Sequence, residues 1–231
     1  MLFRQFFDTT SSTYTYLIAD EDSREALLID PVLEQSEGYL RLLNELGFTL
    51  KRAMDTHTHA DHITALGKLR DMTGCETYMG QQAHSACANN SFSDGSQIQV
   101  GQLSLTALYT PGHTDDSYCF LLDHDGQKYL FSGDTLLIRG TGRTDFQNGS
   151  AADQFSSLFN KLLTLPEDTW VYPAHDYKGW MVSTIGEERL HNPRLQVSDV
   201  VAYKQIMDNL NLPNPNMMDV AVPANRACGN L

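Results

Sequence analysis

The sequence predicts an α+β protein in which two mixed β-sheets are flanked by helices. Segments typical of strands and helices alternate at both ends of the chain, whereas strand-like runs follow one another through its middle. A doubly wound parallel sheet would need strands and helices to alternate throughout. At 231 residues the chain is long enough to bury a full core, so we expect a single domain over residues 1–231.

The first third of the chain alternates strands with helices. Strands are expected over three runs rich in β-branched, aromatic or other apolar residues: Thr13–Ala19, Ala26–Ile29 and Phe48–Met54. Apolar residues recur at helical spacing over Glu34–Leu46, and Gly47 can end that helix. We expect Asp61 to cap a second helix over His62–Met72, which Gly74 would end.

The middle of the chain is strand-rich, and its last third is mostly helical. Three strand-like runs, two of them joined by an Asp125-Gly126 turn, are Gln97–Tyr109, Ser117–Leu122 and Lys128–Ser132. The later elements are a helix over Ala152–Leu163, a strand over Thr169–Tyr172 and a helix over Val197–Met207. The tail from Asn211 to Asn225 carries three prolines, and we expect it to be irregular.

Composition excludes several classes of function. A net charge of −13 argues against a sequence-independent nucleic-acid binder, which needs a basic surface to displace counterions. No apolar run approaches the roughly 20 residues of a membrane span, and the N-terminus does not read as a signal peptide. The four cysteines show no regular spacing, so we expect reduced thiols in a cytoplasmic protein. They are Cys75, Cys87, Cys119 and Cys228.

The segment Thr56-His57-Thr58-His59-Ala60-Asp61-His62 follows a predicted strand and carries the strongest functional signal. Imidazole nitrogens and carboxylate oxygens are the usual ligands of first-row divalent metals. Any one of these histidines could be an ordinary surface residue. Three imidazoles and a carboxylate within six positions indicate a metal site.

Three further candidate ligands, His113, Asp134 and His175, each follow a predicted strand. Gly112 and Gly133 precede the first two, and glycine permits the sharp turn that presents a side chain at the end of a sheet. The remaining histidines lie outside this pattern and are expected to be surface or structural residues: His84, His124 and His191.

The ordered set H-x-H-x-D-H, then His, Asp and His, resembles that of the metallo-β-lactamase superfamily. The resemblance implies an αβ/βα sandwich with its metals at one edge between the sheets. It selects no reaction, because one fold hosts many chemistries. A non-catalytic binding module would predict a missing ligand, and none is missing.

Two metal arrangements stay open at this point. A thioester hydrolase similar to glyoxalase II would hold two metals and make a hydroxide nucleophile from water. The first metal would take His57, His59 and His113, the second would take Asp61, His62 and His175, and Asp134 would bridge them. An oxygenase would bind one metal through His57, His113 and Asp134, which leaves three positions open.

The run from Leu136 to Gln147 looks like that of the persulfide dioxygenases, also called the ethylmalonic encephalopathy protein family or sulfur dioxygenases. Glyoxalase II has a different segment there and an added helical domain that we do not expect here. Thr141 departs from some animal members, which carry a cysteine at that position. Further matches extend the resemblance over essentially the whole chain: Tyr172–Tyr177, Val182–Thr184, Glu187–Arg189, Asn192–Arg194, Asn209–Pro213 and Val222–Asn225.

The resemblance implies a persulfide dioxygenase that oxidises glutathione persulfide with O₂ and water to sulfite and glutathione. It further implies one Fe(II) per chain, held by His57, His113 and Asp134. The other four candidates would surround the site or form a second one: His59, Asp61, His62 and His175. A homodimer and a bacterial cytoplasmic location are implied as well, with neither nucleic acid nor membrane as a partner.

Arg143 and Tyr177 are the predicted substrate contacts. The guanidinium of Arg143 suits a substrate carboxylate, because it binds carboxylates through two parallel hydrogen bonds. Alternatively, Arg143 is a structural residue paired with Asp145 or Asp176. Tyr177 directly follows the His175-Asp176 pair and would hydrogen-bond the substrate or serve in packing.

Overall fold

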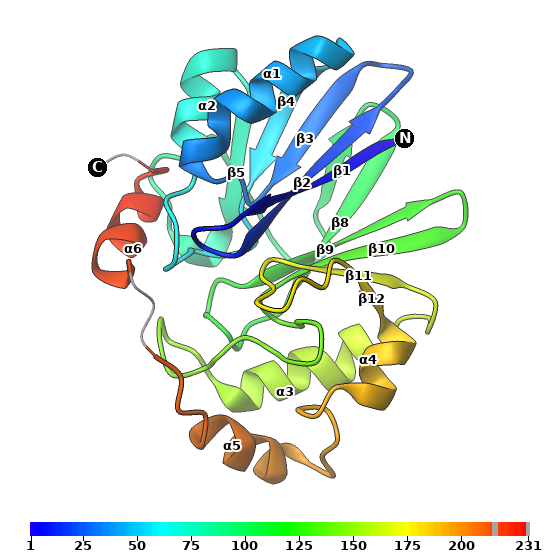
Figure 1. Ribbon diagram of the computed structural model, residues 1–231, viewed down its shortest axis with the longest axis vertical. Coiled ribbons are helices and arrows are strands. Elements are labelled where there is room, and N and C mark those ends of the chain that lie inside the picture. The colour runs from blue at the N-terminus through cyan, green and yellow to red at the C-terminus, as the bar shows by residue number, and fades with distance from the viewer. Residues whose placement is uncertain (214–216, 230–231) are drawn as a thin grey trace. The chain divides into compact units, whose positions relative to one another are not determined.

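The computed structural model describes residues 1–213 and 217–229 (Figure 1). Its contacts divide the chain into two compact units. The first comprises residues 1–92, 97–104 and the C-terminal residues 217–229; the second comprises residues 93–96 and 105–213. That the two units act as a single domain over residues 1–231 stays a prediction.

The strands of the described residues form two six-stranded sheets, and both sheets are mixed. The first has the order β1 (Leu2–Asp8), β2 (Thr13–Asp20), β3 (Glu25–Ile29), β4 (Thr49–Met54), β5 (Glu76–Gly80) and β6 (Asn90–Phe92). Strands β1 to β3 are antiparallel, and β3 to β6 are parallel. Three of these strands, β2, β3 and β4, confirm the strands that the sequence predicts.

Two helices pack against the first sheet, α1 (Ser36–Leu46) and α2 (Leu66–Thr73), with short 3-10 turns η1 (Leu33–Gln35) and η2 (Gln81–Ala83) (Figure 1). Leu43 of α1 and Leu66 of α2 are buried with Leu28 of β3 in one apolar cluster. Gly47 ends α1 in the left-handed conformation, as expected.

The prediction that Asp61 caps a helix beginning at His62 is wrong. Helix α2 begins at Leu66, and its N-cap residue Ala65 makes no side-chain cap bond. The carboxylate of Asp61 instead lies 3.1 Å from the hydroxyl of Thr13 and 2.9 Å from Nδ1 of His62. These side-chain partners compete with the backbone N–H groups that a cap would bind.

The prediction of an irregular C-terminal tail is wrong for residues 218–226, while residues 214–216 lie outside the described part. Helix α6 (Met218–Arg226) forms there despite Pro223, with Asp219 in its first turn. Ala221 and Ala224 of α6 are buried against Ile63. Packing of this small-residue face stabilises the helix where proline alone would disfavour it.

The prediction of four reduced cysteines is wrong for one pair. Cys87 and Cys228 form a disulfide across 141 residues of sequence. Cys75 and Cys119 are buried thiols, as expected. Sequence spacing carries no information about a pair that only the tertiary fold brings together, so the disulfide could not be read from the chain.

The second sheet has the order β12 (Ser183–Thr184), β11 (Trp170–Pro173), β10 (Gln127–Gly133), β9 (Tyr118–His124), β8 (Leu103–Tyr109) and β7 (Gln97–Val100). The expected strand Gln97–Tyr109 is thus two strands joined by a tight turn at Gly101, whose φ is +55°. The hairpin between β9 and β10 turns at Asp125 and Gly126, both with positive φ, as predicted.

Helices α3 (Ala151–Asn160) and α4 (Ile185–His191) pack against the second sheet with the turn η3 (Leu162–Thr164), and α5 (Val200–Asp208) packs against α3 (Figure 1). Ser150 caps α3, and Asp199 caps α5 by accepting from the Ala202 N–H at 2.9 Å. Of the histidines outside the metal pattern, His84 and His191 are exposed and His124 is partly buried.

Within residues 1–213 and 217–229, no helix combines the length and the apolar character that crossing a membrane requires. The expected location of the protein remains a prediction.

Asn225 of α6 connects the tail to the loop after β4. Its side-chain oxygen accepts from the Thr64 N–H at 2.8 Å, and its amide donates to the carbonyls of His59 at 2.9 Å and His62 at 2.8 Å. The side chain is completely buried. One side chain therefore fixes three backbone groups of this loop.

We expect Asn225→Ala to lower the free energy of unfolding by about 2–4 kcal/mol, because it removes three buried hydrogen bonds. Denaturant titration followed by circular dichroism measures the change. Asn209→Ala, which removes an exposed contact to the Gln205 carbonyl within its own helix, is the control and should cost less than about 0.5 kcal/mol. Equal effects of the two substitutions would show that Asn225 does not brace the loop.

Candidate metal centre

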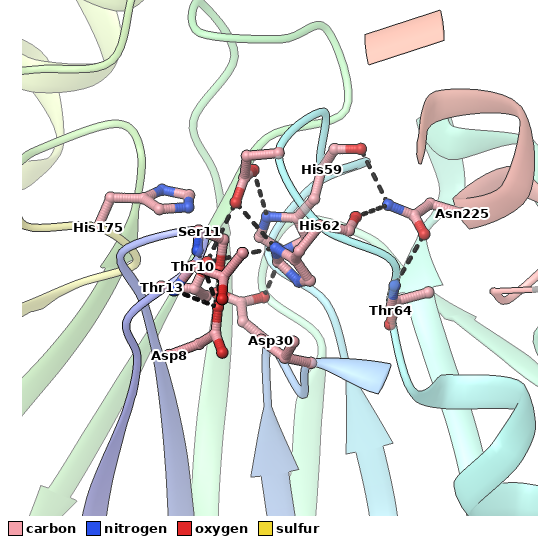
Figure 2. A network of polar contacts seen from close by, with 12 residues as sticks. Asp8, Thr10, Ser11, Thr13, Asp30, His59, His62, Thr64, His175 and Asn225 are labelled. Carbon is pink, nitrogen blue, oxygen red and sulfur yellow. Dashed lines mark hydrogen bonds and ion pairs between the residues drawn. The ribbon is translucent and has the colours of Figure 1, made fainter. Parts of the chain in front are cut away.

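The first group of candidate ligands lies in the loop that follows β4, and Asp30 at the end of β3 organises it (Figure 2). Asp30 accepts from the Thr56 N–H at 2.6 Å and from the Thr56 hydroxyl at 3.0 Å. It also lies 3.1 Å from Nε2 of His59. Asp30 and His59 are both fully buried. A single carboxylate thus holds the start of the loop against the sheet.

The tautomer of His57 follows from its contact with Thr56. Nδ1 of His57 lies 2.9 Å from the Thr56 hydroxyl oxygen. Because that hydroxyl donates its one hydrogen to Asp30, it accepts from His57. Nδ1 therefore carries the hydrogen, and the lone pair of Nε2 is the one suited to a metal.

Negative charge accumulates around His59. Burial disfavours its charged form, but Asp30, Asp55 and Asp61 outweigh burial and raise the pKa of His59 to about 9. Oxygens of Asp30 and Asp55 and a ring nitrogen of His59 lie within 4.8 Å of one another. The same arrangement of carboxylates favours any cation bound beside this loop.

His62 continues the network toward Ser11 and Thr13, at the turn between β1 and β2 (Figure 2). Nδ1 of His62 lies 2.9 Å from Asp61 and 3.3 Å from the Thr13 hydroxyl. The Thr13 hydroxyl is 2.7 Å from that of Ser11. Ser11 in turn donates hydrogen bonds to the carboxylate of Asp8. Burial raises the pKa of this carboxyl group, but the hydrogen bonds from Ser11 outweigh burial and lower it. The loop is thereby tied to the edge of the first sheet.

The second group comes from the ends of β8, β10 and β11 in the second unit. His113 and Asp134 follow Gly112 and Gly133, whose φ angles are +142° and +51°. A Cβ at Gly112 would lie 2.3 Å from the backbone of Gln154, so α3 can approach only because this residue has no side chain. The expectation of a sharp turn at a glycine before His113 and before Asp134 is confirmed by the positive φ of both glycines.

The tautomer of His113 is fixed by a backbone carbonyl. Nδ1 of His113 donates to the carbonyl of Arg143 at 2.7 Å, since a carbonyl can only accept. Nε2, the nitrogen suited to a metal, lies 3.6 Å from Oδ2 of Asp134. Nδ1 of His175 donates to the other carboxylate oxygen of Asp134 at 2.7 Å. His175 therefore occupies one oxygen of Asp134, and the second oxygen faces His113.

These donors fit a divalent metal. Two imidazoles present Nε2 lone pairs, and a carboxylate presents one oxygen, which is the ligand chemistry of iron, zinc and related ions. The structure brings four predicted residues together in the first unit and three in the second. They are His57, His59, Asp61 and His62, then His113, Asp134 and His175.

The predicted substrate contacts lie in the second unit. Arg143 pairs with Asp145 through two hydrogen bonds of 2.7 and 2.8 Å and donates to the Pro213 carbonyl at 2.7 Å. The hydrogen bonds from Arg143 lower the pKa of Asp145. Tyr177 is 73% exposed, and its ring is stacked on that of His175 with centroids 6.3 Å apart. Of the two possibilities for Arg143, the pairing with Asp145 is present.

Sequence reasoning missed the residues that hold the ligands. Asp30 and Thr56 flank predicted strand ends, and a carboxylate directly after a buried strand could have indicated the first of them. Gln154 lies on a helix 12 residues from the Gly142 carbonyl that it contacts, and Asn225 lies 166 residues from that of His59. Their amides carry no signal of these contacts in the sequence.

Comparison with known proteins agrees with the fold. The model of the metallo-β-lactamase superfamily matches residues 8–175. The mitochondrial persulfide dioxygenase ETHE1 of Mus musculus is 47% identical over 99% of this chain and 89% of its own length, and that of Homo sapiens is 48% identical with the same coverage.

A solved structure extends the similarity to three dimensions. The crystal structure of ETHE1 from Myxococcus xanthus superimposes with a TM-score of 0.95 at 53% identity, covering 99% of this chain and 100% of that chain. The predicted fold class is thereby confirmed. The chain belongs to the metallo-β-lactamase superfamily and, within it, to the family of persulfide dioxygenases.

Proposed function

We propose that the chain is an iron-dependent persulfide dioxygenase that converts glutathione persulfide, O₂ and water into sulfite and glutathione. The observation that carries this proposal is near-full-length similarity to persulfide dioxygenases, at 47–48% identity. The reaction balances: the outer sulfur loses four electrons to O₂, water supplies the third oxygen of sulfite, and the inner sulfur leaves as the thiol of glutathione. Two protons are released.

The proposed ligands of one Fe(II) per chain are His57, His113 and Asp134. Both histidines carry their hydrogen on Nδ1, which supports ligation through Nε2. His175 donates to one oxygen of Asp134, which argues against a carboxylate that bridges two metals through both oxygens. A bound Fe(II) would supply the redox chemistry by which O₂ oxidises the persulfide sulfur.

The other four candidates are proposed to position the ligands and hold charge around them. His59 anchors its loop to Asp30, and His175 orients Asp134. Asp61 and His62 are bound to each other and to Thr13. A dinuclear hydrolase similar to glyoxalase II would instead recruit all four as ligands, whereas the relatives at 47–48% identity are persulfide dioxygenases.

Arg143 and Tyr177 remain the proposed substrate contacts. The exposed ring of Tyr177 beside His175 is accessible to a substrate, which supports its role. Arg143 donates twice to Asp145 and once to Pro213. A guanidinium has five N–H hydrogens, so two remain for a carboxylate of the glutathione moiety. The homodimer expected from the resemblance also remains a prediction.

The reaction itself is tested by oxygen uptake. We expect the iron-loaded protein to consume O₂ only when glutathione persulfide is added and to form one sulfite per O₂. An oxygen electrode and sulfite quantification measure the two quantities. Cleavage of a glutathione thioester without O₂ uptake would reassign the reaction to hydrolysis and leave the membership of the metallo-β-lactamase superfamily in place.

The one-metal arrangement is tested by paired substitutions. We expect His57→Ala to abolish iron binding, because it removes a ligand, whereas His62→Ala should retain most of the iron. Titration of the apo-protein with Fe(II) under anaerobic conditions measures the affinity of each variant. His84→Ala, which changes an exposed histidine, is the control. Equal loss of iron from the His57 and His62 variants would contradict a single metal.

Substrate binding by Arg143 is tested by steady-state kinetics. We expect Arg143→Ala to raise KM for glutathione persulfide about 10- to 100-fold with kcat nearly unchanged, because a charge-assisted hydrogen bond is worth roughly 1.5–3 kcal/mol. Asp145→Asn is the matched control, since it weakens the ion pair but keeps the guanidinium. A lowered melting temperature with unchanged KM in Arg143→Ala would assign Arg143 a structural role only.

A further inference from the structure

The backbone segment Thr141–Arg143 presents three successive carbonyls, and each accepts from a different side chain. Arg194 donates to the carbonyl of Thr141, and Gln154 donates to that of Gly142 at 3.1 Å. The third carbonyl accepts from Nδ1 of His113 at 2.7 Å. The ring of His113 is therefore set by a backbone segment that two other side chains hold in place.

A chain of hydrogen bonds connects those two side chains. Arg194 lies 3.2 Å from the hydroxyl of Thr141, which lies 3.1 Å from the hydroxyl of Tyr203. Tyr203 donates in turn to the side-chain oxygen of Gln154 at 2.8 Å. The carbonyl of Gly142 can only accept, so Gln154 faces it with its nitrogen and accepts from Tyr203 with its oxygen; the Tyr203 oxygen is then left to accept from Thr141.

The amide of Gln154 therefore has a single orientation. Its oxygen accepts from Tyr203, so its nitrogen must point to the carbonyl of Gly142. If the amide were reversed, its nitrogen would face the donating hydroxyl of Tyr203, and its oxygen would face the carbonyl oxygen of Gly142. Thr141, Gln154 and Tyr203 are all buried, where an unmade hydrogen bond is expensive and water does not replace it.

The same segment also touches the backbone of Asp134. The N–H of Gly142 donates to the carbonyl of Asp134 at 2.6 Å. A Cβ on Gly142 would lie 2.3 Å from that carbonyl oxygen and 2.7 Å from Nδ1 of His113. Only glycine allows this approach, so both proposed ligands of the second unit rest on one short segment.

We propose that Arg194, Tyr203 and Gln154 are positioning residues, which fix the ring orientation and the Nδ1–H tautomer of His113 through the carbonyls of residues 141–143. The inference rests on the proposed function in one respect, that His113 binds the metal. These residues would contact neither substrate nor metal. They act by orienting the ring of His113 so that Nε2 faces the proposed metal position.

Tyr203→Phe is the direct test, because it keeps the ring and removes the hydroxyl that orients Gln154. In the apo-protein at about pH 8, where histidine is mostly neutral, ¹⁵N NMR distinguishes the two tautomers of His113. We expect wild type to show Nδ1–H alone and the variant to show a mixture. The affinity for Co(II) should fall about 10- to 100-fold, as for other outer-shell substitutions.

Matched variants separate positioning from general destabilisation. Tyr129→Phe removes a phenol hydroxyl from β10 outside the network and should leave tautomer and affinity unchanged. Thr141→Val breaks the link between Arg194 and Tyr203 and should weaken Co(II) binding, whereas Thr141→Ser keeps the hydroxyl and should restore it. The threonine pair also decides the matter if Tyr203→Phe does not fold.

A folded Tyr203→Phe with His113 in the wild-type tautomer and with wild-type Co(II) affinity would overturn the proposal, as would equal affinities of the two threonine variants. The tautomer is read in the apo-protein, independently of catalysis. A protein that shows the expected tautomers but consumes no O₂ would sustain the positioning network while the proposed reaction failed.

Discussion

The hydrogen bond from His113 to the carbonyl of Arg143 is the constraint on which the candidate ligands of the second unit depend. A carbonyl can only accept, so this contact decides which ring nitrogen is left for a metal. The carbonyl in turn must be in the right place. Gly142 lets the segment lie directly against His113, and donors from Gln154 of α3 and from Arg194 hold it there.

In the first unit, a side-chain hydroxyl instead of a backbone carbonyl decides which ring nitrogen carries the hydrogen. The Thr56 hydroxyl, committed as a donor to Asp30, accepts from Nδ1 of His57. Asn225 then fixes the carbonyls of the loop from a helix near the C-terminus. In both units the orientation of a candidate ligand is set by residues outside the proposed ligand set, and such outer hydrogen bonds tune metal affinity in proteins.

The local features of the site could be predicted from sequence, because they depend on neighbours along the chain. His57, His113 and Asp134 follow strand ends, and the positive φ of Gly112 and Gly133 accords with their place before a ligand. The same local reasoning failed at Asp61. This residue type often caps a helix, but here its carboxylate interacts with Thr13 and His62.

What escaped prediction is long-range. The Cys87–Cys228 disulfide joins residues 141 positions apart in the sequence. Asn225 is 166 and 163 positions from His59 and His62, whose carbonyls it contacts. Helix α6 is stabilised by the packing of Ala221 and Ala224 against Ile63, and the prolines nearby in the sequence give no sign of this contact.

Metal content is the most direct test of the central claim that three of the seven candidates bind one ion. Elemental analysis of the purified protein should give about one iron per chain; two zinc ions per chain would contradict it.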